Sequence, residues 1–217
     1  PPALIQRETN QIIIILVHQR MTSEQPPTAL VYTGQPKRSF PRGMTHVDVQ
    51  PSVKKIRKGA FNATVGLRQV ELREGLTDIG KEAFGGCISV ERIQIPRTVI
   101  TIGERAFISC SHLREVELPR DGALSFILDG AFAACSTLQR IFIPSTVEII
   151  SNQAFRECTQ LVEVVLSEGL KFVGAQAFQG CASLEQIHLP TTVKSIGDHA
   201  FRFCRNLREV ELREGLP

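Results

Sequence analysis

The stretch from residue 79 to residue 96 reads Ile-Gly-Lys-Glu-Ala-Phe-Gly-Gly-Cys-Ile-Ser-Val-Glu-Arg-Ile-Gln-Ile-Pro, and versions of it recur along most of the chain. Its Ala-Phe pair is the clearest landmark, and the aromatic residue of that pair stands at Phe61, Phe84, Phe107, Phe132, Phe155, Phe178 and Phe201. Successive pairs are 23 residues apart, except for one interval of 25 between Phe107 and Phe132. A fixed period of this size is the sequence signature of stacked structural repeats.

Each repeat also contains the pattern of a short strand. Counting from Phe84, a Cys stands three residues on and aliphatic residues follow at six, nine and eleven, the last two being Ile93 and Ile95. Apolar residues that alternate with polar ones predict a strand with one buried face, and the Pro that follows in several repeats ends it. A second apolar pair, such as Val99 and Ile102, predicts a short extended piece followed by one helical or 3₁₀ turn.

A unit this small cannot bury its apolar side alone, so neighbouring units must cover one another. We therefore expect a right-handed solenoid with short parallel strands on its concave face, and with turns and short helical or 3₁₀ segments on its convex face. We expect Asp121 and Gly122, beside the two-residue insertion, to form a bulged loop. Two columns of side chains are expected to stack as the core: Phe84, Phe107, Phe132, Phe155, Phe178 and Phe201, and Cys87, Cys110, Cys135, Cys158, Cys181 and Cys204.

At this level of detail the chain resembles the BspA-like leucine-rich repeats, whose pattern is close to I-x-x-x-A-F-x-x-C-x-x-L-x-x-I-x-L-P. The resemblance covers roughly residues 46 to 217, although Thr64 replaces the Cys of the first unit and Arg73 replaces its Pro. It implies a leucine-rich-repeat solenoid that serves as a non-catalytic binding or adhesion module, of a kind found in bacterial surface proteins and in many protist and algal proteins. It does not name a ligand.

The six cysteines all occupy the same slot of the repeat, which favours packing over chemistry. In-register side chains point in parallel and fit poorly to the geometry of a disulfide, so we interpret them as free buried thiols. Ser109-Cys110-Ser111-His112 looks like a Cys/His site, but the repeat places Cys110 in the buried column. The sequence contains no Cys-x-x-Cys pair, and we expect no metal, no cofactor and no enzymatic activity.

The composition is that of a folded globular protein, with 42% hydrophobic residues and a net charge of +3, too small to indicate nucleic-acid binding. The longest apolar run, 12–17, is far shorter than the roughly 20 residues of a membrane-spanning helix, so we expect no membrane insertion. Charges alternate between repeats, as at Arg92 and Glu115, which predicts lateral pairing along the sheet. Residues 54–58 are basic, yet Ile56 falls on a buried position, so we interpret this run as a solvated first turn.

One outward column is the candidate binding site. The residues that stand ten positions after each repeated Phe are Glu71, Gln94, Glu117, Phe142, Val165, His188 and Glu211. Three neighbours in this column, Phe142, Val165 and His188, would form an apolar and aromatic patch that is rimmed by Glu117 and Glu211. Such a patch is typical of the centre of a protein interface. The alternative is that these are scattered surface apolar residues.

Residues 1–45 lie outside the repeat register and form an N-terminal head that is either partly disordered or a cap. Within it, 29–33 are the candidate capping strand, and 1–20 precede Met21 as a read-through extension. Residues 46–217 form the repeat domain, which stops in the middle of a unit, and we interpret it as a fragment of a longer array or as an end that another molecule covers.

The leading interpretation is a scaffold that binds a protein partner through the concave strand face. Without a convincing signal peptide, and with free cysteines, a cytoplasmic location is favoured. The alternative is a cell-surface or secreted adhesin, and a hydrolase or transferase is a third possibility.

Overall fold

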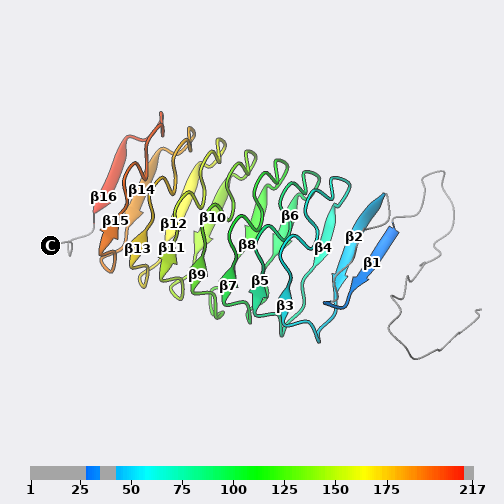
Figure 1. The fold of residues 1–217 in the computed structure, drawn as a ribbon. Helices are drawn as coiled ribbons and strands as arrows, with labels where there is room; N and C mark the ends of the chain where they lie inside the picture. Colours follow the sequence, from blue (N-terminus) through cyan, green and yellow to red (C-terminus); the bar gives the residue numbers. More distant parts are fainter. Residues whose placement is uncertain (1–27, 35–42, 213–217) are drawn as a thin grey trace, which may run out of the picture.

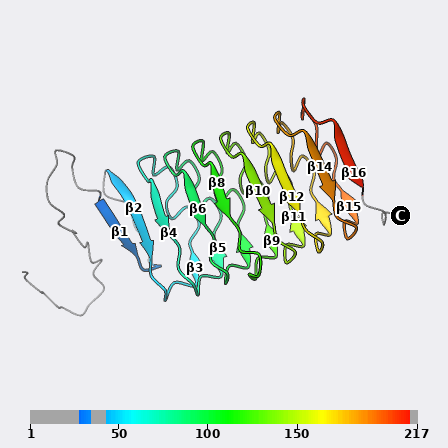
Figure 2. The same ribbon diagram turned by 180° about the vertical axis from the view of Figure 1, so that it is seen from behind.

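The computed structural model describes residues 28–34 and 43–212, which form a stack of similar rungs that follow one another along a single axis (Figures 1 and 2). The rungs contribute strands to two faces of the stack. The long strands of one face are β1 (Thr28–Tyr32), β2 (Met44–Val49), β4 (Gln69–Glu71), β6 (Arg92–Gln94), β8 (Glu115–Glu117), β10 (Arg140–Ile143), β12 (Glu163–Leu166), β14 (Gln186–Leu189) and β16 (Glu209–Leu212). They are hydrogen-bonded in three consecutive groups, β1-β2-β4, β6-β8-β10-β12 and β14-β16, which we together call the long-strand sheet. The short-strand sheet contains β3 (Lys55–Ile56), β5 (Asp78–Ile79), β7 (Thr101–Ile102), β9 (Phe126–Ile127), β11 (Ile149–Ile150), β13 (Phe172–Val173) and β15 (Ser195–Ile196).

Every strand pair is parallel, and the partners are equivalent positions of neighbouring repeats. Arg92 pairs with Glu115 and Arg140 pairs with Glu163, so the expected register is confirmed. The alternating charges meet across these pairs, with Arg92 Nε 3.2 Å from Glu115 Oε2 and Arg140 Nε 3.4 Å from Glu163 Oε2. All of these side chains are well exposed, so each ion pair contributes only a few tenths of a kcal/mol.

The prediction of a helical or 3₁₀ turn on the convex side is wrong. The described residues contain no helix, and each Ala-Phe pair lies in a run of consecutive turns. The amide of Phe84 donates to the carbonyl of Ala106 in the next rung, at 2.8 Å, whereas the amide of Cys87 turns back to Phe84. Successive amides thus alternate between the neighbouring rung and their own, and a helix cannot supply this because it directs all of its amides along its own axis.

Alternation of this kind requires residues with positive φ. In each rung one such residue stands two positions before the repeated Phe and another stands two positions after it, as with Gln153 (φ 58°) and Glu157 (φ 60°) around Phe155. Several of these residues are not glycine, so their backbone is strained. The inter-rung hydrogen bonds compensate for this strain.

The expected core ladders are confirmed. The Phe rings from residue 61 to residue 201 stack face to face, with successive centroids 5.0 to 5.7 Å apart and interplanar angles of 3° to 14°. Tyr32 packs edge-on against Phe61 at 5.0 Å and caps this stack at its N-terminal end. The column of cysteines runs beside the rings, and all six thiols are free.

The two-residue insertion forms a loop between β8 and β9, as expected. Its turn covers residues 120–122, and Asp121 accepts a hydrogen bond from Arg97 of the previous rung at 2.6 Å. The loop rises beside the long-strand sheet and brings Arg120 to the face that carries Phe142.

A strand is found in the head segment, where β1 pairs in parallel with β2. The amide of Arg57 donates to the Tyr32 hydroxyl at 3.3 Å, and Arg57 Nε donates to the carbonyl of Gly34 at 2.8 Å. These bonds tie β1 to the first rung. Residues 1–20, predicted to be an extension, and 213–217, where the last unit stops, lie outside the described residues.

Candidate binding face on the long-strand sheet

The candidate residues of the outward column lie on consecutive strands of the long-strand sheet. Strand pairing places Phe142 beside Val165 and places His188 beside Glu211. Val165 and His188 come from the adjacent strands β12 and β14, and both line the same shallow hollow of about 330 Å³. Glu117 and Phe142 line a second hollow of about 340 Å³. The five candidate residues therefore form one continuous row over the last rungs of the solenoid.

Phe142 is less exposed than its outward position suggests. The guanidinium carbon of Arg120 lies 4.2 Å from the centroid of the Phe142 ring, in the geometry of a cation–π contact. Such a contact contributes roughly 0.5–1 kcal/mol at an exposed site. Arg120 comes from the insertion loop and was not among the predicted site residues. The signal that could have found it is the insertion itself, which occurs in only the repeat that precedes Phe142.

Val165 is the most open apolar side chain of the row, with 41% of its surface exposed. Beside it, Val162 is also exposed and lines the same hollow, where Glu163, Glu185 and Gln186 supply polar groups. An apolar floor with polar side chains at its margin is the arrangement that a partner's apolar side chain can fill.

His188 and Glu211 are coupled to one another. His188 Nδ1 lies 2.6 Å from Glu211 Oε2, and both side chains are about half exposed. The ring nitrogen donates this hydrogen bond, because an ionised carboxylate can only accept. The hydrogen bond to the carboxylate therefore fixes the orientation of the imidazole next to Val165. In this orientation one edge of the ring is available to a partner.

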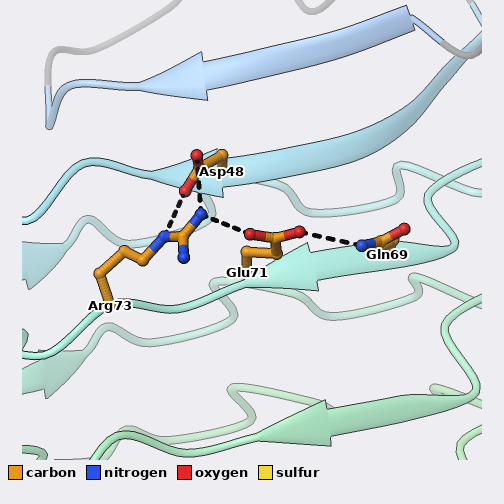
Figure 3. Close-up of polar contacts among 4 residues, drawn as sticks. All are labelled: Asp48, Gln69, Glu71 and Arg73. Carbon is orange, nitrogen blue, oxygen red and sulfur yellow. Dashed lines mark hydrogen bonds and ion pairs between the residues drawn. The ribbon is translucent and has the colours of Figure 1, made fainter.

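The other end of the face is polar and largely satisfied by its own contacts (Figure 3). Arg73 donates to both oxygens of Asp48, at 2.8 and 3.0 Å, and also to Glu71, which accepts a further bond from Gln69 at 3.0 Å. The hydrogen bond and the charge of Asp48 raise the pKa of Arg73. A wider hollow of about 490 Å³ lies nearby, and His46, Arg92 and Glu115 are among its lining residues. This end mixes both signs of charge and offers no apolar centre.

A second apolar stripe lies on the short-strand sheet, and the sequence interpretation missed it. Phe126, Ile149 and Phe172 occupy equivalent positions of three successive strands, β9, β11 and β13. Ile100, the residue just before β7, is also exposed, at 42%. The signal was available, because the position six residues before each repeated Phe carries these three apolar residues in succession.

The Cys110 and His112 pair is not a catalytic site. Cys110 is fully buried and its Sγ donates to the carbonyl of Phe84 at 3.2 Å, whereas His112 Nδ1 contacts the carbonyl of Ile88 at 2.6 Å. Burial raises the pKa of the Cys110 thiol, so the reactive thiolate is disfavoured.

The part of the chain that the structure describes contains no group of three His, Cys, Asp or Glu side chains that could hold a metal ion. Within 28–34 and 43–212 there is also no helix with the length and apolar character needed to cross a membrane.

Comparison with known proteins places this geometry in a family. Residues 41–147 and 125–217 match the BspA type leucine rich repeat region, in six copies. A search of curated proteins found no match.

Solved structures with the same fold come from several bacteria. A T. pallidum leucine rich repeat protein is 30% identical, with 73% of this chain and 78% of that one covered and a TM-score of 0.63. A leucine-rich repeat protein from Bacteroides ovatus is 23% identical, with 80% and 50% covered and a TM-score of 0.61. A leucine rich cell surface protein from Faecalibacterium prausnitzii is 26% identical, with 78% and 55% covered and a TM-score of 0.55. This chain thus spans about half the length of the last two proteins. The family model matches most of the chain, and the Phe and Cys columns of its pattern lie in the core. The chain therefore belongs to the BspA-type leucine-rich repeat family.

Proposed function

We propose that this protein is a non-catalytic scaffold that binds a protein partner through the long-strand sheet. The centre of the binding face is the row formed by Phe142, Val165 and His188, and Glu117 and Glu211 are its rim. The observation that carries the proposal is the continuity of this row, in which the apolar members line two adjoining hollows. Interfaces concentrate their binding energy in a few apolar and aromatic residues that polar groups surround.

The chemistry of the described residues supports a binding role over catalysis. The five most buried cysteine thiols sit in the core column with raised pKa values, caused by burial, and so are poor nucleophiles. The residues of the face itself are an aromatic ring, an aliphatic side chain and an imidazole that is already hydrogen-bonded to a carboxylate. These groups provide shape and orientation for a partner.

A second candidate function is adhesion at the cell surface. It is supported by the likeness to the F. prausnitzii protein, which is described as a leucine rich cell surface protein. An adhesin would use the same face, but its ligand would be outside the cell. The two candidates therefore differ in where the partner is found and share the residues that bind it.

The test is affinity capture from both lysate and culture medium of the source organism. Wild-type protein is compared with a variant that carries Phe142→Glu, Val165→Lys and His188→Glu. The matched control carries Lys55→Glu, Asp78→Lys and Asn62→Glu on other surfaces, because these changes alter the formal net charge by the same amount. Circular dichroism first establishes that all three proteins are folded.

The proposal expects a partner that the wild type and the control retain and that the triple variant loses. Retention of the same partner by all three proteins would overturn the assignment of the face. A partner recovered from the medium or from the cell envelope would favour the adhesin, and one recovered from the lysate would favour the intracellular scaffold.

A further inference from the structure

The hollows of the long-strand sheet follow the grouping of its strands. The strands pair through three or four residue positions within four couples, which are β2 with β4, β6 with β8, β10 with β12 and β14 with β16. β8 and β10 share only the pair of Glu115 with Arg140, and no pairing joins β4 to β6 or β12 to β14 among these described strands. The hollow of about 490 Å³, here the first hollow, contains residues of β4 and β6. The hollow of about 330 Å³, here the last hollow, contains residues of β12 and β14, so both lie where strand pairing is interrupted.

Side chains hold these two junctions together beyond the ends of the strands. Thr98 Oγ1 accepts a hydrogen bond from the amide of Gly75 at 2.8 Å and donates one to the carbonyl of Leu76 at 2.7 Å. Thr192 makes the equivalent two bonds across the junction of β12 and β14, both at 2.9 Å. The rungs are thus fixed beside each other while their strands stay unpaired, so both hollows are part of the fold.

Each of these two hollows contains a carboxylate that is available to a cation. The first hollow is lined by four Glu and two Arg side chains, and the last hollow by two Glu side chains and no Arg or Lys. Ion pairs engage Glu115 and Glu163. Glu91 and Glu185 are exposed at equivalent positions, seven residues after a repeated Phe, and no ion pair engages either of them within residues 43–212. The face therefore attracts positive charge at two separate points.

The surroundings of these carboxylates define what can fill the hollows. Val165 lies exposed in the last hollow beside Glu185, so a Lys or Arg side chain can lay its alkyl stem on the valine and direct its charge to the carboxylate. The hollow of about 340 Å³ lies between the other two and is here the middle hollow. It contains the ring of Phe142 and the opposite charges of Glu117 and Arg120, which suits an uncharged apolar side chain.

We propose that the partner presents to this face a basic, proline-rich segment in the polyproline II conformation. Arg or Lys side chains at positions i and i+6 of the segment enter the first and last hollows, and an apolar side chain at i+3 lies at the middle hollow beside Phe142. The inference rests on the proposed function, because it identifies the kind of partner that the same face binds.

The spacing of the two carboxylates selects this conformation. Glu91 and Glu185 precede β6 and β14, which are four rungs apart, and at a strand spacing of about 4.8 Å this corresponds to about 19 Å. A polyproline II helix rises about 3.1 Å per residue with about three residues per turn, so six residues advance about 19 Å and return to the same side. An α-helix needs about 13 residues for this distance, and residues so far apart lie on different sides of the helix. A β-strand needs about six residues, but its i+3 side chain points away from the sheet.

The face also offers hydrogen-bond donors to such a segment. A polyproline II helix has no internal hydrogen bonds, so its carbonyl groups are free to accept. Arg92 and Gln94 line the first hollow and Gln186 lines the last hollow, and all three side chains are exposed. Their N–H groups can donate to the carbonyls, while the ring of Phe142 supplies the aromatic surface on which polyproline II segments dock.

The test is fluorescence anisotropy with a labelled peptide of the sequence Pro-Pro-Arg-Pro-Pro-Leu-Pro-Pro-Arg-Pro-Pro. The control peptide, Pro-Pro-Pro-Arg-Pro-Leu-Pro-Arg-Pro-Pro-Pro, has the same composition and charge, but its arginines are at i and i+4. We expect the control peptide to bind about tenfold more weakly, because it reaches only one of the two carboxylates at a time.

Variants of the two carboxylates locate the peptide on the face. Glu91→Lys and Glu185→Lys are each expected to raise the Kd of the first peptide by about tenfold, since each places a like charge against an arginine. Asp129→Lys makes the same change of charge in an exposed turn of the convex side and should leave the Kd unchanged. Glu91→Gln and Glu185→Gln should give smaller increases in Kd with less disturbance of the surface. Circular dichroism establishes that each variant is folded.

Three outcomes would overturn the inference. Equal affinity for the two peptides would reject the spacing, and binding that neither Glu91→Lys nor Glu185→Lys weakens would place the peptide elsewhere. Absence of binding by the first peptide would reject a basic polyproline II segment as the partner. None of these results changes the capture of a partner by the triple variant of Phe142, Val165 and His188, so the proposed function is judged separately.

Discussion

Cys158 Sγ donates a hydrogen bond to the carbonyl oxygen of Phe132, one repeat earlier, at 3.2 Å. The same carbonyl accepts the amide of Cys135 from its own repeat, also at 3.2 Å. The thiol thus links two rungs through a carbonyl oxygen that also accepts a backbone amide within the turn of its own rung. The same bond recurs from Cys87 to Cys204, which explains why one small residue with a weak donor fills this slot in six repeats.

Replacing Cys158 with Ala removes the donor and leaves a small void in the fully buried column. We expect a loss of about 1–2 kcal/mol in the free energy of unfolding. Urea denaturation followed by circular dichroism measures it. Cys204→Ala is the matched control, because Cys204 is only partly buried and should cost less. Equal costs at the two positions would contradict the role given to burial in this column.

The buried thiols also predict sensitivity to alkali. Burial raises the pKa of Cys87 and of Cys158 to about 12, from an ordinary value of 9.0. Between these values the unfolded chain releases thiol protons that the folded chain keeps, so the free energy of unfolding falls as the pH rises. Each such thiol contributes about 1.4 kcal/mol per pH unit.

The corresponding measurement is the urea midpoint in a reducing buffer at about pH 8 and about pH 10, on either side of the unfolded thiol pKa. The midpoint should fall steeply at the higher pH, and the fall should be smaller for Cys158→Ala than for the wild type. A fall of the same size in the two proteins would show that this thiol does not cause it.

The residues with positive φ in the turns predict that substitution by glycine does not destabilise the protein there. Ala134 has φ of 58°, a conformation that costs a non-glycine residue roughly 1–2 kcal/mol, whereas its neighbour Ala133 does not share it. Ala134→Gly should therefore leave stability unchanged or raise it, while Ala133→Gly should lower it by about 1 kcal/mol. Thermal unfolding of the two variants side by side provides the comparison. If Ala134→Gly proved the more destabilising, the account of the turns would be wrong.

Gly169 predicts the opposite response. Its φ is +117°, and a Cβ atom built on it would lie 2.0 Å from the carbonyl oxygen of Ser145 in the previous rung. Gly169→Ala is expected to cost about 2 kcal/mol or more, since backbone must move. Gly130→Ala is the control, because there the nearest atom is the side-chain Cγ of Arg105 at 3.3 Å and the cost should be smaller. The two unfolding free energies should differ clearly, and equality would show that the rungs can separate at this point.

The sequence predicted those features that repeat the same residue types in the same slots. The stack of rings at Phe132 and Phe155, the buried thiols and the row of Phe142 beside Val165 all follow from a period of 23 and from the alternation of a strand. In each case a local pattern is enough, because every rung meets only its neighbours.

The remaining features depend on contacts that the local pattern does not encode. Gln153 and Glu157 have no preference for positive φ, so the sequence suggested a helical turn, and the inter-rung hydrogen bonds impose the observed backbone. The position of Arg120 over Phe142 depends on the path of an inserted loop. The stripe at Phe126 and Phe172 is visible in the sequence, but its residues stand one position before the second member of each buried apolar pair, and only that pair entered the prediction.

The most direct test of the central claim is the affinity of the captured partner for wild-type protein and for the single variant Val165→Lys. Val165 is the open centre of the row, so a buried charge there is expected to raise the Kd by about tenfold or more, which corresponds to about 1.4 kcal/mol. Lys55→Glu, on the opposite sheet, should leave the Kd unchanged. An unchanged Kd for Val165→Lys, in a protein shown to be folded, would contradict the claim that the long-strand sheet is the binding face.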